Sequence, residues 1–202
     1  MRYSPLLALV LLLLSTMGHV NSQGMRDGPA AEYAVFTEFS PATKALKDGW
    51  NTRVFTNTDA KQGNGIQCDF ATGFITLAPG SYHVSGYSMV VYDSGGEPPE
   101  MATIRAPAAG GYSRLRVYDP ARPIDQSDLR SLDNGDPSVI SIGSPSTPNV
   151  TPSLFDAYFT TDKTVQVLLE HQSGSHPDHT FLRIYIEKSP WHALARISIR
   201  RI

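Results

Sequence analysis

The chain has 202 residues and a formal net charge of −2 at pH 7, from 17 Lys and Arg against 19 Asp and Glu. This mildly acidic balance provides no basic surface for nucleic acid, which is therefore excluded as a partner. Cys68 is the one cysteine in the sequence, so the chain forms no internal disulfide and depends on its core, or on association with other chains, for stability.

The N-terminus has the pattern of a secretory signal peptide. Arg2 precedes an apolar run over residues 6–14 that is too short to cross a bilayer, and Gln23 follows small residues that suit cleavage. We expect residues 1–22 to be the signal peptide, 23–32 a flexible leader and 33–202 one domain. This predicts a secreted protein, periplasmic or extracellular, with no membrane attachment after cleavage. The alternative is an uncleaved N-terminal anchor.

The first half of the chain predicts short strands separated by turns. Apolar and aromatic residues recur at strand spacing in residues 33–39, 50–56, 66–77 and 81–92. Pro79 and Gly80 separate the last two runs, which are therefore predicted to be two strands joined by a corner. Residues 43–48 are expected to form a single helical turn, and the polar residues 57–65 a loop.

The second half continues the same pattern. Strands are predicted at residues 101–106, 112–118, 139–142, 155–160, 164–170, 181–187 and 191–202. Loops are predicted at residues 93–100, 119–137 and 143–152 from their Gly, Pro and Asp content. About ten short strands with almost no helix indicate an all-β fold, an antiparallel sandwich or jelly roll.

A central motif consists of Thr72, Gly73, Ile75, Thr76, Pro79, Gly80, Tyr82 and Val84. It resembles the signature of the complement globular-head and tumour-necrosis-factor-like superfamily. Residues 139–144, 153–155 and 162–167 resemble the later strands of microbial and phage-type members. Residues 181–187 and 191–202 both compete for the closing strand of the sheet, and we favour the second.

This resemblance implies a two-sheet jelly-roll sandwich of about ten strands that assembles as a homotrimer around an apolar and aromatic axis. Association would also bury apolar area that a chain without disulfides needs for stability. We assign six side chains to trimer or core packing, namely Phe36, Phe39, Tyr82, Val84, Ile197 and Ile199.

Two groups of residues have ligand-type side chains. The first group is His171, His176, Asp178 and His179. Their nitrogen and oxygen atoms are ligands that zinc accepts, so these residues are a candidate zinc site. The alternative, which we favour, is a solvated hairpin loop, because the stretch is rich in Gly and Ser and the spacing fits no established ligand set. The second group is Asp125, Asp128, Asp133 and Asp136, whose carboxylate oxygens make it a candidate calcium site. The complete calcium-loop pattern, with a glutamate at its end, is absent. No cofactor is assigned on this basis.

The sequence contains no nucleophile elbow, no His-Glu-x-x-His motif and no phosphate-binding loop. We therefore predict a secreted, non-enzymatic, trimeric recognition domain that presents its three loops to a protein or glycan partner. One alternative is a metal-dependent secreted hydrolase or carbohydrate-active jelly roll that uses the histidine stretch. Another is a structural coat, spike or adhesin head.

Overall fold

The computed structural model describes residues 31–39, 44–93, 110–121, 136–172, 180–183 and 193–202. All regular elements in these ranges are β-strands. The described residues contain no helix with the length and apolar character needed to cross a bilayer.

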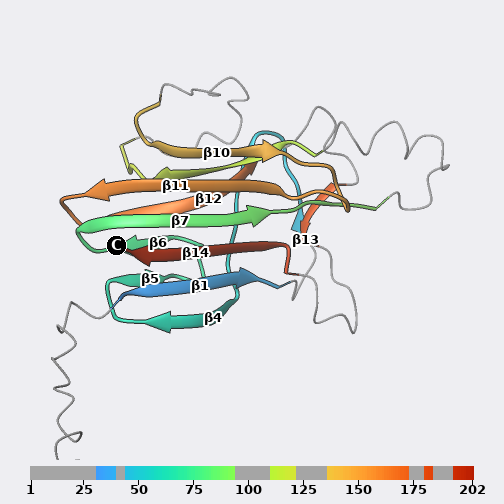
Figure 1. Cartoon of the computed structure of the whole chain (residues 1–202). Helices are drawn as coiled ribbons and strands as arrows, with labels where there is room; N and C mark the ends of the chain where they lie inside the picture. Colours follow the sequence, from blue (N-terminus) through green and yellow to red (C-terminus); the bar gives the residue numbers. More distant parts are fainter. Residues whose placement is uncertain (1–30, 40–43, 94–109, 122–135, 173–179, 184–192) are drawn as a thin grey trace, which may run out of the picture. The chain divides into compact units, whose positions relative to one another are not determined.

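Two antiparallel sheets form the sandwich (Figure 1). The first sheet contains, in spatial order, β11 (Ser153–Thr161), β7 (Gly80–Ser88), β14 (Ala195–Arg201), β1 (Tyr33–Glu38) and β4 (Asn57–Gln62). The second sheet contains β10 (Val139–Pro145), β9 (Tyr112–Val117), β12 (Val165–Gln172), β6 (Ile75–Leu77) and β5 (Ile66–Cys68), and β3 (Trp50–Thr52) also pairs with β12. A small third sheet contains β2 (Lys44–Ala45), β13 (Thr180–Arg183) and β8 (Val91–Tyr92).

The chain crosses repeatedly from one main sheet to the other. It does so between β4 and β5, between β6 and β7, and at both ends of β11. The corner predicted at Pro79 is thus the crossing from β6 to β7, and the all-β antiparallel jelly roll predicted from the sequence is confirmed.

The core lies between the inner faces of the two main sheets. Tyr82 and Val84 of β7 and Ile197 and Ile199 of β14 are fully buried in it, as alternation along a strand predicts. Burying a large apolar side chain contributes about 1.5–3 kcal/mol relative to leaving it exposed.

The closing strand of the first sheet is β14, the favoured one of the two candidates. It lies between β1 and β7, with Ile197 opposite Phe36 on one side and Gly86 on the other. Phe181, from the competing stretch, belongs to β13 of the small sheet.

Several local predictions are wrong. The predicted loop at residues 57–65 contains β4, whose mostly exposed polar side chains hide its backbone pairing with β1. The predicted helical turn contains β2, because Lys44 and Ala45 pair with β13. The predicted strand at residues 66–77 is a hairpin of β5 and β6, in which Gly73 donates its N–H to the carbonyl of Asp69. The third predicted loop begins within β10.

Candidate functional site

Ser88 of β7 and His171 of β12 meet inside the sandwich. The Ser88 Oγ lies 2.7 Å from His171 Nδ1, and His171 Nε2 lies 2.7 Å from the carbonyl oxygen of Gly110. Because a carbonyl only accepts, Nε2 carries the proton and Nδ1 accepts from the serine hydroxyl. The pair is therefore fixed in one hydrogen-bonding pattern.

This pair is the Ser and His arrangement closest to nucleophilic catalysis among the described residues, but it is inaccessible. Both side chains are fully buried, and Arg53 also donates to Ser88 Oγ at 2.9 Å. Burial, followed by the nearby charge of Arg53, lowers the pKa of His171 to about 3. The pair consequently acts as a structural link between the sheets.

A second polar cluster joins β9 to β12. The Nε atoms of Arg114 and Arg116 lie 2.6 Å and 2.9 Å from the same oxygen of Glu170. The Arg114 guanidinium also lies 3.8 Å from the centre of the Trp50 ring. All four side chains are buried, so the cluster is part of the scaffold.

Most of the predicted metal ligands lie outside the described residues. His176, Asp178 and His179, and likewise Asp125, Asp128 and Asp133, fall in ranges that are not described. Of the rest, His171 lies in β12 rather than in a loop, and Asp136 accepts from the Ser138 N–H at 2.8 Å. Within the described ranges, no three His, Cys, Asp or Glu side chains gather closely enough to hold a metal. Both metal sets stay predictions.

The six predicted packing residues lie at the core or its border. Five belong to the core of the single chain, namely Phe36, Tyr82, Val84, Ile197 and Ile199, and Phe39 is half-buried just after β1. A side chain with no exposed surface in one chain has none to offer a second chain. Any contact between copies must therefore use residues other than these five.

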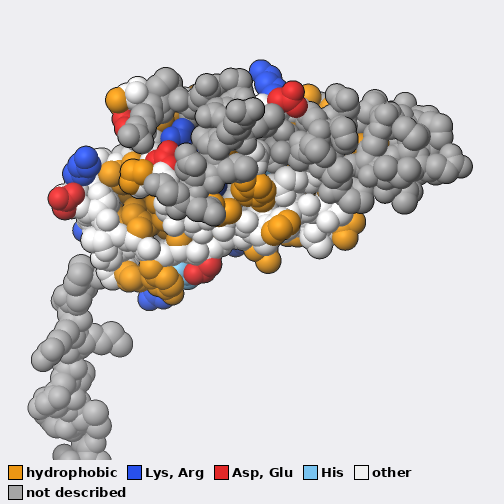
Figure 2. Space-filling view, turned by 90° about the horizontal axis from the view of Figure 1, so that it is seen from above, with side chains coloured by type: hydrophobic (Ala, Val, Ile, Leu, Met, Phe, Trp, Pro, Cys, Tyr) orange, Lys and Arg blue, Asp and Glu red, His pale blue; other side chains and the backbone are white. Residues whose placement is uncertain are grey.

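Large apolar side chains are exposed on the edge of the sandwich where β10 and β11 run. Leu154 and Tyr158 of β11 are 58% and 68% exposed, and Ile142 of β10 is 40% exposed. Figure 2, which views the molecule from above this edge, shows hydrophobic side chains spread over the described part of the surface. Since β11 is an outer strand of the first sheet, its exposed side chains are available for association.

The polar groups of this surface lie beside the aromatic ones. The rings of His83 and Tyr158 stack at 4.4 Å with an angle of 15° between them, and His83 Nε2 lies 2.9 Å from an Asp156 carboxylate oxygen. We call the outward residues Leu154, Asp156 and Tyr158, together with His83 and Tyr87 of β7, the β11 face. Beyond it on β14, Arg196 and Arg200 lie opposite Tyr87 and His83.

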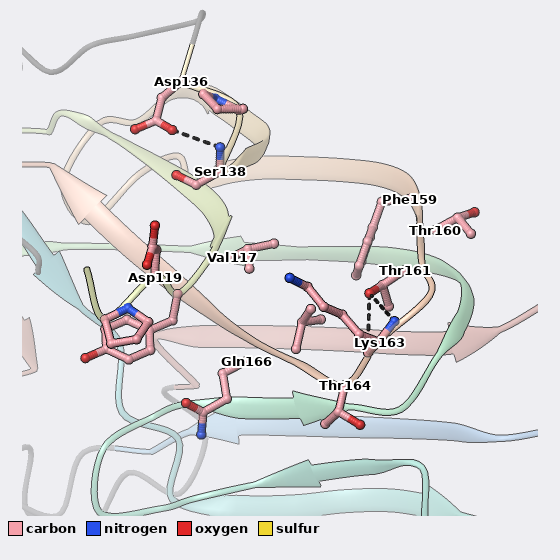
Figure 3. Close-up of a pocket in the computed structure, with 14 residues that line it drawn as sticks. Val117, Asp119, Asp136, Ser138, Phe159, Thr160, Thr161, Lys163, Thr164 and Gln166 are labelled. Atoms are coloured by element: carbon pink, nitrogen blue, oxygen red, sulfur yellow. Dashed lines mark hydrogen bonds between the residues drawn. The ribbon is translucent and has the colours of Figure 1, made fainter. Parts of the chain in front are cut away.

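A cavity of about 710 Å³ opens at one end of the sandwich, where β9 ends and β11 turns into β12. Val117, Phe159 and Val165 form its apolar part, and their other sides pack against the core. Asp119, Asp136 and Lys163 bring charge to it, as Figure 3 shows.

The three predicted recognition loops do not start at one end of the domain. Asp119 and Asp136 lie at the cavity, next to the Val117 end of β9. Asn149 bonds in both directions with the backbone of Tyr92, at 3.1 Å and 2.8 Å, near the opposite end of the strands. The described parts of these loops therefore lie at opposite ends of the domain, and their presentation to a partner stays a prediction.

Sequence reasoning missed the β11 face and the Ser88–His171 pair. In β11, apolar residues stand on both sides of the alternation, with Phe155 buried and Leu154 and Tyr158 exposed. The sequence does indicate a strand with two apolar faces, but the pattern does not say which one meets the core.

Comparisons with known proteins identify a structural similarity but no family. No family model matches the sequence, and no curated protein matches it. Among solved structures, the crystal structure of murine APRIL at pH 8.0 is similar, with a TM-score of 0.49 and 7% sequence identity, over 85% of this chain and 99% of that chain.

Proposed function

We propose that this chain is a secreted, non-enzymatic recognition domain that assembles as a homotrimer through its β11 face. The observation that carries the proposal is the exposure of Leu154 and Tyr158 on an outer strand, at 58% and 68%. The N-terminal signal pattern supports secretion, and the superfamily resemblance of the central motif supports a three-fold assembly.

The β11 face is better suited to another protein surface than to water. Leu154, Asp156 and Tyr158 are alternate residues of β11, so their side chains lie on the same side of the strand. Covering them removes apolar area from water at about 25 cal/mol per Å². A chain without an internal disulfide gains stability from this burial.

A second copy of the chain fits this surface by charge. Asp156 has a 61% exposed side chain, and the exposed Arg196 and Arg200 of β14 lie farther along the same sheet. If the edge of one copy docks on the sheet surface of the next, an acidic edge meets a basic surface. Such a contact joins different surfaces on the two copies and closes into a ring when the rotation allows.

Three copies on one rigid body would combine weak binding sites into tighter overall binding. The mechanism requires no chemical step, since the sandwich only holds the binding surfaces at fixed spacing. The partner in this proposal is a protein or a glycan.

The test is the mass in solution of the chain from residue 23 onward, measured by light scattering. We expect three times the chain mass for the unchanged protein. Leu154→Asp combined with Tyr158→Asp should lower this mass towards that of one chain, because the contact would then bury unpaired carboxylates. Val150→Asp is the matched control, since Val150 is 71% exposed but lies outside β11.

A monomeric mass for the unchanged protein would overturn the trimer. A trimer that survives the double substitution would leave the assembly standing and remove the β11 face from it. Thermal unfolding of each variant separates lost assembly from lost folding, because both positions are exposed and their substitution leaves the core intact.

A further inference from the structure

The cavity at the end of the sandwich is built from two kinds of surface. Val117, Phe159 and Val165 are partly buried hydrophobic residues, with one side against the core and the other towards the cavity. Phe159 is held in place by its stacking on Tyr82, with ring centres 5.7 Å apart. The apolar part of the cavity is therefore fixed by the core, as in a largely preformed ligand site.

The rest of the lining is rich in groups that donate and accept hydrogen bonds. Ser138 and Thr164 bring hydroxyl groups, and Gln166 brings an amide. A hydroxyl or amide can both donate and accept, so this lining suits a ligand whose own groups do both. A sugar ring has that property, and its C–H face would suit the apolar side chains.

The charges favour a ligand without a negative charge. Asp119 and Asp136 contribute two carboxylates to the lining, against one ammonium from Lys163. In Figure 3 the Lys163 side chain extends from its turn towards Val117, and both carboxylates lie on the far side of Val117 from that turn. An acidic sugar would meet a net repulsion here, whereas a neutral one would not.

We propose that this cavity binds a short neutral oligosaccharide. Its volume of about 710 Å³ lies within the usual range for small-molecule sites, about 300–1,000 Å³. The inference rests on the proposed recognition function in so far as it names the partner class, but it does not require the trimer. A protein partner at this position is the competing outcome.

Calorimetric titration of the chain from residue 23 onward tests the inference. The probes are neutral oligosaccharides of hexose and N-acetylhexosamine units, and the same oligosaccharides ending in sialic acid. We expect binding of at least one neutral probe and at least tenfold weaker binding of its sialylated form.

The test variant combines Thr164→Val with Gln166→Leu, which keeps side-chain size and removes the hydrogen-bonding groups. Its matched control is Thr58→Val with Gln62→Leu on β4, where both residues are exposed and remote from the lining. We expect the first variant to lose tenfold or more in affinity and the control to keep it. Absence of binding by every neutral probe, equal binding of sialylated forms, or an unaffected first variant would overturn the inference.

Light scattering on the same samples keeps the two proposals apart. A monomer that binds the neutral probe would contradict the trimer and support the cavity. A trimer that binds none of the probes would contradict the cavity alone.

Discussion

His171 is a base that the fold keeps neutral. To take up a proton at Nδ1, it must give up the hydrogen bond from Ser88 and place a positive charge near Arg53, inside the core. The Gly110 carbonyl already accepts a hydrogen bond from the protonated Nε2. Burial and charge therefore act in the same direction, and the cost of protonation appears as lost stability.

We predict that the domain loses stability as the pH falls from about 6.5 towards 3. The pKa of His171 is about 3 in the folded chain against an ordinary value of 6.5, so the unfolded chain binds the extra proton throughout that range. At about 1.4 kcal/mol per pH unit, the loss is on the order of 4 kcal/mol over the whole window. The contribution of neutral His171 to stability is fully present above about pH 6.5.

Urea unfolding at several pH values, for the unchanged chain and for His171→Gln, measures this effect. Carboxylates such as Glu32 and Asp69, whose pKa values are lowered by hydrogen bonds, add a slope at the acidic end in both proteins. The difference between the two proteins isolates the histidine. Parallel curves would contradict the prediction.

At the scale of elements, the turn between β5 and β6 depends on one glycine. Gly73 has φ of +81°, a region that disfavours residues with a Cβ, and a Cβ added there would overlap the carbonyl oxygen of Arg53. Gly63 has φ of +82°, but the three atoms nearest to an added Cβ belong to the Glu32 side chain and not to backbone. The two glycines share a backbone conformation and differ in what surrounds them.

We predict that Gly73→Ala destabilises the domain by about 3 kcal/mol or more, since backbone must move as well as adopt a strained φ. Gly63→Ala, the matched control, should cost less, because it adds to a strained φ, worth about 1–2 kcal/mol, only the displacement of one partly exposed side chain. Free energies of unfolding in urea give both values. Equal losses in the free energy of unfolding would contradict the prediction, because they would mean that the backbone at Arg53 moves aside at little cost.

The elements predicted correctly from the sequence are those whose side chains alternate between core and solvent. In β14 the alternation of Ile197 and Ile199 with polar neighbours predicted both the strand and its buried side. In β4 the side chains are mostly exposed, so only backbone pairing with β1 defines the strand. No periodic signal exists for such an element.

At the scale of the whole molecule, Arg53 connects parts of the chain that no local pattern brings together. It donates to Glu38 of β1 at 3.2 Å, to Ser88 of β7 at 2.9 Å and to the carbonyls of Met89 and, at 2.7 Å, Leu182 of β13. These partners come from the first sheet, from the residue that follows β7 and from the small sheet. The sequence offered no prediction of this network, because its members meet only once the jelly roll has formed.

The same reasoning explains which parts of the candidate sites were predictable. The stretch that contributes Asp119 and Asp136 was predicted as a polar loop from composition alone, whereas the apolar side of the cavity required the packing of β9 against β11 and β12. A composition signal locates a loop, but only the fold shows which core residues lie beneath it.

We predict that Arg53→Met destabilises the domain by about 3–5 kcal/mol, because it removes a charged donor from the fully buried Glu38. Adding Glu38→Gln to it should restore part of the loss, since a neutral amide is easier to bury than a carboxylate. Lys61→Met on the exposed strand β4 is the control and should change stability by no more than about 0.5 kcal/mol. Urea unfolding of the four proteins, with the single Glu38→Gln variant to complete the double-mutant cycle, gives the coupling energy between the two charges. If Arg53→Met costs no more than the control, the sheets are held together by apolar packing alone and the buried network is dispensable.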